Sequence, residues 1–194
     1  MNVNEMKTRL LQLEETFKIH ESELTELDRA IGDGDHGVNM VRGFSSVKDK
    51  IDDSSMQALL KSIGMALMSN VGGASGPLYG FSFVKMASVA KDDMNHQDII
   101  TLIKTFAEAI SARGKVNLNE KTMYDVVARV AEKLENGETL SLNQLQQLAD
   151  NTKDMVATKG RAAYFGEESK GYIDPGAQSM VFVLNALIGD ENNG

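Results

Sequence analysis

Apolar residues recur at helical spacing along almost the whole chain. Near the N-terminus, Met6, Leu10, Leu13 and Phe17 are three or four residues apart, which places them on one face of an α-helix. The same spacing returns in the middle of the chain, for example over 99–110. Nowhere do apolar and polar residues alternate as they do in a half-buried strand. The pattern therefore predicts an all-α protein.

Turn and capping residues divide this pattern into eight predicted helices. Asn95 and Ser141 are the expected N-caps of the fifth and seventh, and Asp53 or Ser54 that of the third. Both prolines of the chain fall where a predicted helix begins, where a missing N–H costs little. The predicted helices span 3–27, 38–50, 54–69, 77–91, 96–112, 121–136, 141–158 and 176–188.

The connections between these helices alternate in character. The second, fourth and sixth are short and polar, whereas the other four are rich in glycine and charged residues. Alternate connections of an up-and-down bundle lie at the same end. We therefore predict eight antiparallel amphipathic helices in an up-and-down barrel or bundle, with a functional site at one end. The four unusual connections are 28–37, 70–76, 113–120 and 159–175, the last of which we name the flap.

The composition and net charge limit the classes of function that the chain can have. The 194 residues suit a single domain spanning 1–194. A net charge of −8 argues against a nucleic-acid binder. The absence of cysteine and the presence of three histidines argue against disulfides, thiolate catalysis and zinc sites. No apolar run reaches the roughly 20 residues of a membrane span, and no secretory signal is evident, so a cytoplasmic protein is expected.

The first unusual connection, DRAIGDGDHG (28–37), carries Asp28, Asp33 and Asp35 among three glycines. Gathering three carboxylates costs free energy unless a cation neutralises them, and oxygen ligands suit Mg²⁺ or Ca²⁺. An EF-hand is excluded, because neither register places a glutamate at position twelve. A plain Gly-Asp turn, with Asp35 as a helix cap and Asp28 solvated, is the alternative interpretation.

Two further connections suggest contacts with phosphate or nucleotide. The segment NVGGASGPLYG (70–80) ends one helix and opens the next, and free N–H groups at a helix start bind anions. It is not a Walker A loop, and a tight helix–helix turn is the alternative. In RGKVNLNEKTM (113–123), the basic residues could face a phosphate and Met123 could pad an adenine ring. Met123 could equally be a core gap-filler.

The flap is too long for an ordinary bundle connection, which favours a functional role. Arg161 offers a fork of donors for phosphate, although a plain surface charge is the alternative. Asp174, Pro175 and Gly176 form a turn that opens the last helix. The flap is therefore a candidate cover for the predicted site.

Together these segments resemble a known family. The motifs IGDGDHG (31–37), GGASGPLY (72–79), KTM (121–123) and GRAAY (160–164) occur in the order found in the nucleotide-binding L subunit of dihydroxyacetone kinase. The resemblance spans essentially the whole chain. Two places depart from the family pattern, which often has Gly-Asp where Asn119-Glu120 stand here and Gly-His where Gly171-Tyr172 stand. A related family of fatty-acid kinases carries Thr at the place of His36, which favours the dihydroxyacetone branch.

The resemblance implies a barrel of eight helices with ADP and Mg²⁺ at one end. It implies that Asp28, Asp33 and Asp35 hold two magnesium ions that bridge the nucleotide phosphates. The nucleotide contacts that it implies come from all four unusual connections. They are His36, Gly37, Val38, Asn39, Ala74, Ser75, Gly114, Met123, Arg161, Asp174, Pro175 and Gly176.

The resemblance also implies a division of labour between subunits. The chain carries no obvious base for an alcohol and corresponds to the nucleotide domain alone, which favours the phosphotransferase-system type. There, tightly bound ADP is phosphorylated by a phosphohistidine-carrying subunit and passes the phosphoryl group to dihydroxyacetone on a K subunit. Two alternatives are an ATP-dependent subunit that exchanges free nucleotide and a nucleotide-loaded regulatory module that binds a transcription regulator.

Overall fold

The computed structural model describes residues 1–189; the last five residues of the predicted domain, 190–194, lie outside them. The described residues form helices and no β-sheet, so the all-α prediction is confirmed. The predicted number of helices is wrong, because the described chain contains nine α-helices and two 3₁₀ helices. They are α1 (Val3–Ile19), α2 (Glu21–Ile31), α3 (His36–Ser45), α4 (Met56–Asn70), α5 (Ser75–Ala87), α6 (His96–Gly114), α7 (Tyr124–Glu135), α8 (Leu142–Asp150), η1 (Asn151–Asp154), η2 (Arg161–Ser169) and α9 (Pro175–Ile188).

The additional α-helix arises from a break at His20 inside the predicted helix 3–27. The backbone of His20 leaves the helical region, with φ −98° and ψ 8°. Its ring stacks on Phe182 of α9 at 4.4 Å between centroids, and Nδ1 lies 2.7 Å from Glu23 Oε2. No glycine or proline marks this break, so the sequence pattern runs through it. The second half, α2, extends to Ile31 and therefore includes Asp28.

Two other predictions need correction near the C-terminal half. The predicted helix 141–158 is α-helical only as far as Asp150 and continues as the 3₁₀ helix η1. The flap contains η2, a 3₁₀ helix interrupted by a kink at Gly166, where φ is 51°. The flap is thus a folded element rather than an open loop.

The predicted N-caps are confirmed where the cap depends only on residues close in the sequence. Asn95 and Ser141 each form a capping box with the third residue of their helix. The predicted cap of α4 is displaced by one residue, because Ser55 rather than Asp53 or Ser54 accepts from Ala58 N, at 3.0 Å.

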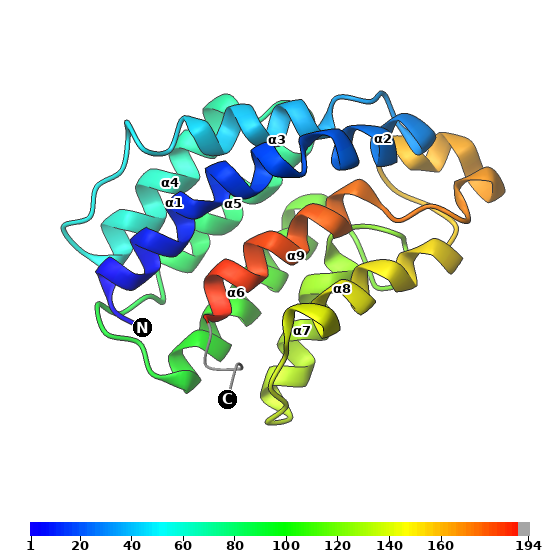
Figure 1. The fold of residues 1–194 in the computed structure, drawn as a ribbon. Coiled ribbons are helices and arrows are strands. Elements are labelled where there is room, and N and C mark those ends of the chain that lie inside the picture. The colour runs from blue at the N-terminus through cyan, green and yellow to red at the C-terminus, as the bar shows by residue number, and fades with distance from the viewer. Residues whose placement is uncertain (190–194) are drawn as a thin grey trace.

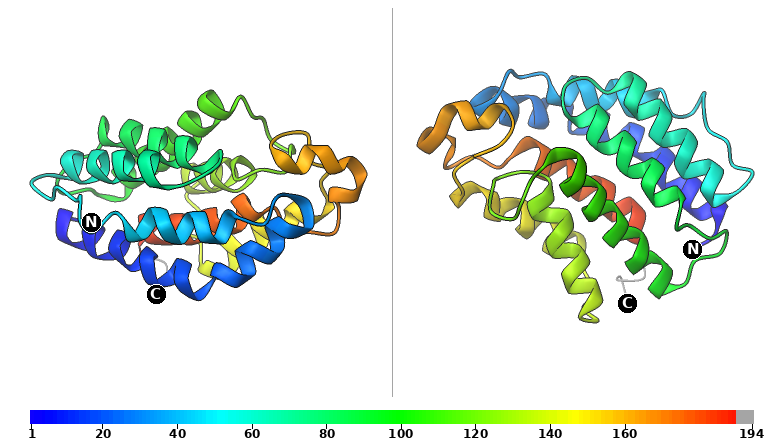
Figure 2. Two further views of the ribbon diagram at one scale, coloured as in Figure 1. Left: turned by 90° about the horizontal axis from the view of Figure 1, so that it is seen from above. Right: turned by 180° about the vertical axis from the view of Figure 1, so that it is seen from behind.

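The helices close into a barrel (Figures 1 and 2). Each α-helix from α3 to α9 packs against the next, and α1 packs against both α3 and α9. The bent α1–α2 pair forms one continuous side of the barrel. When this pair is counted as one element, the nine described α-helices make eight elements, and successive elements run in opposite directions. The predicted up-and-down arrangement is therefore present although the predicted count of eight helices is not, because the break at His20 adds a helix without reversing the chain.

An aromatic chain crosses the interior of this barrel. Phe182 of α9 contacts Phe17 of α1 at 5.9 Å between ring centroids, and Phe17 contacts Phe44 of α3 at 4.7 Å. Tyr79 of α5 continues the chain at 6.5 Å from Phe44 and 6.3 Å from Phe106 of α6. The packing of these large rings joins helices from both halves of the sequence in one core.

Helices α4 and α5 come into close backbone contact at Gly64 and Gly80. A Cβ atom on Gly64 would lie 2.7 Å from the Gly80 carbonyl oxygen and 2.8 Å from Val84 Cγ2. Only a hydrogen at this position lets the two backbones meet at this distance.

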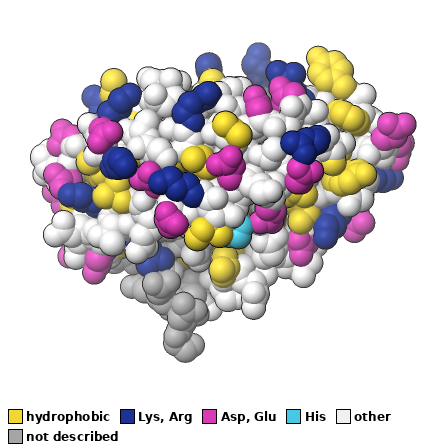
Figure 3. Space-filling view, turned by 45° about the horizontal axis from the view of Figure 1, so that its top comes forward, with side chains coloured by type: hydrophobic (Ala, Val, Ile, Leu, Met, Phe, Trp, Pro, Cys, Tyr) yellow, Lys and Arg dark blue, Asp and Glu magenta, His cyan; other side chains and the backbone are white. Residues whose placement is uncertain are grey.

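On the face shown in Figure 3, acidic and basic side chains are interspersed, and hydrophobic side chains occur in small groups. The net charge of −8 is therefore not gathered into one acidic patch on this face. Among the described helices, none combines the length and the apolar character that crossing a membrane requires.

Candidate functional site

A single pocket of about 470 Å³ receives residues from all four unusual connections or the helix ends beside them. Among the described residues, the second, fourth and sixth connections contribute nothing to its lining. The predicted convergence of alternate connections at one end is therefore confirmed.

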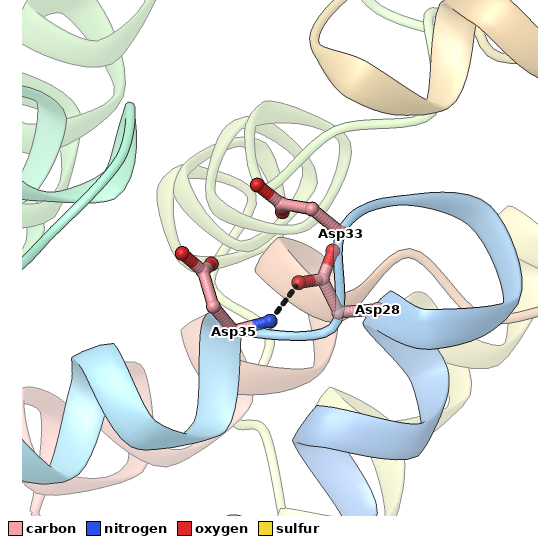
Figure 4. A group of neighbouring side chains, drawn as sticks. All are labelled: Asp28, Asp33 and Asp35. Atoms are coloured by element: carbon pink, nitrogen blue, oxygen red, sulfur yellow. Dashed lines mark hydrogen bonds between the residues drawn. The ribbon is translucent and has the colours of Figure 1, made fainter.

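Three carboxylates meet at one side of the pocket (Figure 4). Asp28 comes from the last turn of α2, Asp33 from the connecting loop and Asp35 from the start of α3. One carboxylate oxygen from each lies within 4.8 Å of the others. In the described part of the chain, neither Asp28 nor Asp35 has an ion-pair partner, whereas Arg161 Nε lies 3.0 Å from Asp33 Oδ2. Three hard oxygen donors with one guanidinium beside them fit a divalent cation.

Asp28 holds the geometry of this cluster together. It is buried, and its Oδ2 accepts hydrogen bonds from Asp35 N at 2.9 Å and His36 N at 3.0 Å. It therefore supplies the N-terminal cap of α3 from the preceding helix, and the interpretation of Asp28 as a solvated residue is wrong. Asp35 occupies the N-cap position without a side-chain cap bond. Gly32 is required beside Asp28, because a Cβ there would lie 2.1 Å from Asp28 Oδ1.

The start of α5 forms a second wall. The pocket is lined here by Gly72, Gly73, Ala74 and Ser75, and no side chain caps the helix. The first N–H groups of a helix lack partners within the helix and carry partial positive charge. This wall is therefore suited to bind an anion.

A buried network of polar side chains lies next to Ser75. His36 Nε2 lies 3.0 Å from Ser179 Oγ, and Tyr79 OH is also 3.0 Å from that oxygen. The Ser179 hydroxyl donates to Gly176 O, so it accepts from both His36 and Tyr79. Burial lowers the pKa of His36, and the neutral ring then turns the lone pair of Nδ1 toward Ser75 Oγ, 3.4 Å away. Tyr79 and Ser179 were not predicted from the sequence, because their partners lie far away along the chain.

The part of the pocket lined by the end of α6 and the segment 114–123 is mostly apolar. Gly114 closes α6 there, and Leu78, Ile110 and Val116 line the pocket beside Met123, together with the polar residues Arg113 and Thr122. Met123 is buried and also belongs to the hydrophobic core. Met123 is therefore a core residue that also lines the pocket, and its contact with an adenine ring stays a prediction.

Two buried charged groups lie where the flap meets this wall. Asp174 caps α9 by accepting from Ala177 N at 2.8 Å, and burial raises its pKa to about 7. Lys121 is fully buried, donates to Thr152 O and Tyr172 O, and has its pKa lowered by burial. We expected the basic residues of 113–123, Lys121 among them, to face a phosphate, whereas the Lys121 ammonium binds these two backbone carbonyls; its burial was not predicted, because an isolated lysine is normally exposed.

Most of the predicted site residues line this one pocket. Two do not: Gly37 packs against the Glu21 carbonyl in the first turn of α3, and the Val38 side chain is exposed. The nucleotide contacts of all the predicted site residues stay predictions. The predicted residues that line the pocket are Asp28, Asp33, Asp35, His36, Asn39, Ala74, Ser75, Gly114, Met123, Arg161, Asp174, Pro175 and Gly176.

Comparison with known proteins agrees with this arrangement. Residues 30–189 match the model of the DAK2 domain. The PTS-dependent dihydroxyacetone kinase, ADP-binding subunit DhaL, of Lactococcus lactis is 42% identical over 176 residues, covering 88% of this chain and 90% of the relative. The PEP-dependent dihydroxyacetone kinase 1, ADP-binding subunit DhaL, of Listeria innocua is 41% identical over 172 residues, covering 87% of this chain and 86% of the relative.

A solved structure shares the fold. The dihydroxyacetone kinase from C. freundii in complex with AMP-PNP and Mg²⁺ superposes with a TM-score of 0.73 at 20% identity. The match covers 96% of this chain and 34% of that longer chain. The family match and the two relatives settle the classification: the chain belongs to the DAK2 family, among the L subunits of dihydroxyacetone kinases.

Proposed function

We propose that this chain is the phosphoryl-transfer subunit of a dihydroxyacetone kinase. In this proposal it keeps ADP and Mg²⁺ tightly bound, accepts a phosphoryl group from a phosphohistidine-carrying subunit of the phosphotransferase system, and delivers it to dihydroxyacetone held on a separate K subunit. The observation that carries the proposal is the cluster of three carboxylates on the wall of a pocket built from all four unusual connections. The names of the L. lactis and L. innocua relatives support the ADP ligand and the donor.

The residues around the pocket have distinct roles in this proposal. Asp28, Asp33 and Asp35 hold two magnesium ions, and the start of α5 binds phosphate through its N–H groups. The apolar end beside Met123 receives the adenine ring. Arg161 adds a cation to the phosphate side from the flap. When bound, the magnesium–nucleotide complex supplies the phosphoryl acceptor and neutralises the charge that develops during transfer.

The first experiment identifies the small molecule that the protein retains. The purified chain is denatured in acid, and the released nucleotide is measured by mass spectrometry. We expect close to one ADP per chain after extensive dialysis with Mg²⁺. A protein that binds no adenine nucleotide, whether purified or after addition of ADP and Mg²⁺, contradicts the proposal.

The second experiment identifies the phosphoryl donor. The ADP-loaded chain is mixed with the K subunit, dihydroxyacetone and either a ³²P-phosphohistidine donor subunit or [γ-³²P]ATP. We expect labelled dihydroxyacetone phosphate from the phosphohistidine donor and negligible label from ATP. Efficient labelling by free ATP, without transfer from phosphohistidine, identifies the ATP-dependent alternative instead.

A further inference from the structure

Lys121 is an unusual residue for the wall of a ligand pocket. Its side chain is fully buried, and its backbone lies in the left-handed region with φ 61°. Both features cost free energy, since an ammonium loses its water and a side chain with positive φ is strained. Such a residue persists where the surrounding contacts determine its position.

The loop that carries Lys121 is fixed to α7. The buried carboxylate of Asp125 accepts from Asn119 N at 2.5 Å and from Thr122 N at 2.9 Å. Arg129 donates to the Asp125 carboxylate at 3.1 Å and to Asn119 Oδ1 at 2.6 Å. These bonds hold the backbone on both sides of Lys121, so the ammonium projects from a rigid base.

The ammonium group joins two points that are distant in sequence. Nζ donates to Thr152 O at 2.5 Å and to Tyr172 O at 2.6 Å. These carbonyls immediately precede and follow the segment 153–171, which carries η2 and Arg161. The ends of the segment also meet directly through a bond from Gly171 N to Lys153 O at 2.8 Å. One buried charge therefore ties both ends of the segment to the wall that holds Met123.

We propose that Lys121 is a positioning residue that fixes the base of the segment 153–171 against the pocket wall and thereby slows the release of bound nucleotide. The inference rests on the proposed nucleotide site. Arg161 lies in this segment and reaches Asp33 Oδ2 at 3.0 Å. Loosening the base of the segment moves Arg161 away from the carboxylates and opens the same side of the pocket, so release becomes faster.

The test measures the dissociation rate of a fluorescent ADP analogue in Mg²⁺, chased with unlabelled ADP. Lys121→Met removes the ammonium at nearly constant size. We expect dissociation about tenfold faster or more, as for the loss of charge-assisted hydrogen bonds. Lys153→Met is the matched control, because Lys153 lies at the same base with an exposed side chain, and its rate should stay within about twofold of wild type. A wild-type rate in Lys121→Met overturns the proposal.

Chemical rescue separates the charge from a general packing effect. The chain has no cysteine, so Lys121→Cys carries a unique thiol. Alkylation of the unfolded variant with 2-bromoethylamine rebuilds a lysine-like ammonium, whereas 2-bromoethanol gives a neutral side chain of similar length. After refolding, we expect slow release to return with the ammonium alone. Equal rates for the two products contradict the proposal, and this comparison also serves if Lys121→Met does not fold.

A double-mutant cycle tests whether Lys121 acts through the segment. In an Arg161→Ala background, Lys121→Met should accelerate release by less than about twofold, because the contact that it positions is already absent. A full tenfold effect in both backgrounds contradicts the mechanism. If wild type itself fails to bind ADP with Mg²⁺, the proposed function is refuted. If wild type binds normally and the variants release the nucleotide at the wild-type rate, only the proposed role of Lys121 is refuted.

Discussion

Asp28 and Asp33 belong to the same carboxylate cluster but are held in different ways. Asp28 caps two N–H groups at the start of α3, whereas Asp33 pairs with Arg161, which is largely exposed. Without Mg²⁺, Asp28→Ala should therefore lower the free energy of unfolding by about 1–3 kcal/mol, because a buried and a partly buried backbone donor lose their partner. Asp33→Asn should change it by less than about 0.5 kcal/mol.

Both substitutions should nevertheless abolish Mg²⁺-dependent binding of ADP. Urea unfolding in EDTA measures the stability difference, and calorimetric titration with ADP and Mg²⁺ measures binding. Equal destabilisation by the two variants would show that Asp28 has no special structural role. Normal binding in Asp33→Asn would remove it from the metal site.

Asp174 should make the stability of the metal-free protein depend on pH. Its folded pKa, raised by burial to about 7, exceeds the value of 3.8 for a free aspartate. Between these two pH values the folded state thus binds more protons than the unfolded state. The stabilising contribution of Asp174 to the free energy of unfolding is therefore fully present below about pH 4 and is lost as pH rises through 7. The free energy of unfolding should gain up to a few kcal/mol from this group at the acidic end.

Urea unfolding in EDTA across pH 4.5–8 measures this dependence. Asp174→Asn, whose amide oxygen can still accept from Ala177 N, should flatten the profile. Glu168→Gln, at an exposed position, is the control and should leave the profile unchanged. An identical profile in wild type and Asp174→Asn would show that Asp174 titrates normally.

At this scale, the sequence indicates functional residues when their chemistry is concentrated locally. The three aspartates fall within eight positions, so their association is visible without a fold. Lys121 and Ser179 are different, because their partners Thr152 and His36 are 31 and 143 residues away. Their roles become visible when the barrel brings those partners to one end.

Among the elements, the α4–α5 pair depends on a close backbone approach. Gly64→Ala should destabilise the protein by about 1–3 kcal/mol, because the new Cβ would lie under 3 Å from Gly80 O and from the backbone N of Val84. The higher helix propensity of alanine offsets about 1 kcal/mol of the steric cost. Thermal and urea unfolding measure the change. Gln57→Ala, at an exposed position of α4, is the control, and equal stability of the two variants would contradict tight packing at Gly64.

Element boundaries follow the same distinction between local and distant causes. Asn95 and Ser141 are caps that bond three residues ahead, and the sequence predicts both correctly. The break at His20 depends on Phe182, a residue of the last helix, so no local signal marks it. The 3₁₀ character of η2 likewise lies in a segment fixed by distant contacts, including those of Lys121.

For the whole molecule, the parity of the connections proved more predictable than the number of helices. The unpredicted break at His20 adds α2 along the direction of α1 and leaves every later connection at its expected end. A miscount that had added a chain reversal would have sent the later connections to opposite ends. The location of the pocket was therefore predictable even though the helix count was not.

Because the pocket lies at one end of the barrel, the structure predicts which loops become protected from hydrogen exchange when ligand binds. Loop amides exchange through local opening, so a ligand protects the loops that it contacts without slowing exchange in distant ones. Addition of ADP and Mg²⁺ should protect 71–76, 115–123 and 159–171 from amide hydrogen exchange. The connections 46–55, 88–95 and 136–141 should exchange as before, since none lines the pocket.

Hydrogen-exchange mass spectrometry measures both groups of peptides in one experiment. Asp33→Asn is the matched control: it preserves the fold but removes a carboxylate from the cluster, so the ligand should protect neither end. Amides 35 and 36 give an internal reference, because Asp28 already holds them in the free protein and the ligand should add little there. Equal protection at both ends in wild type would mean that the ligand tightens the barrel as a whole. The carboxylate end would then have no privileged role in binding.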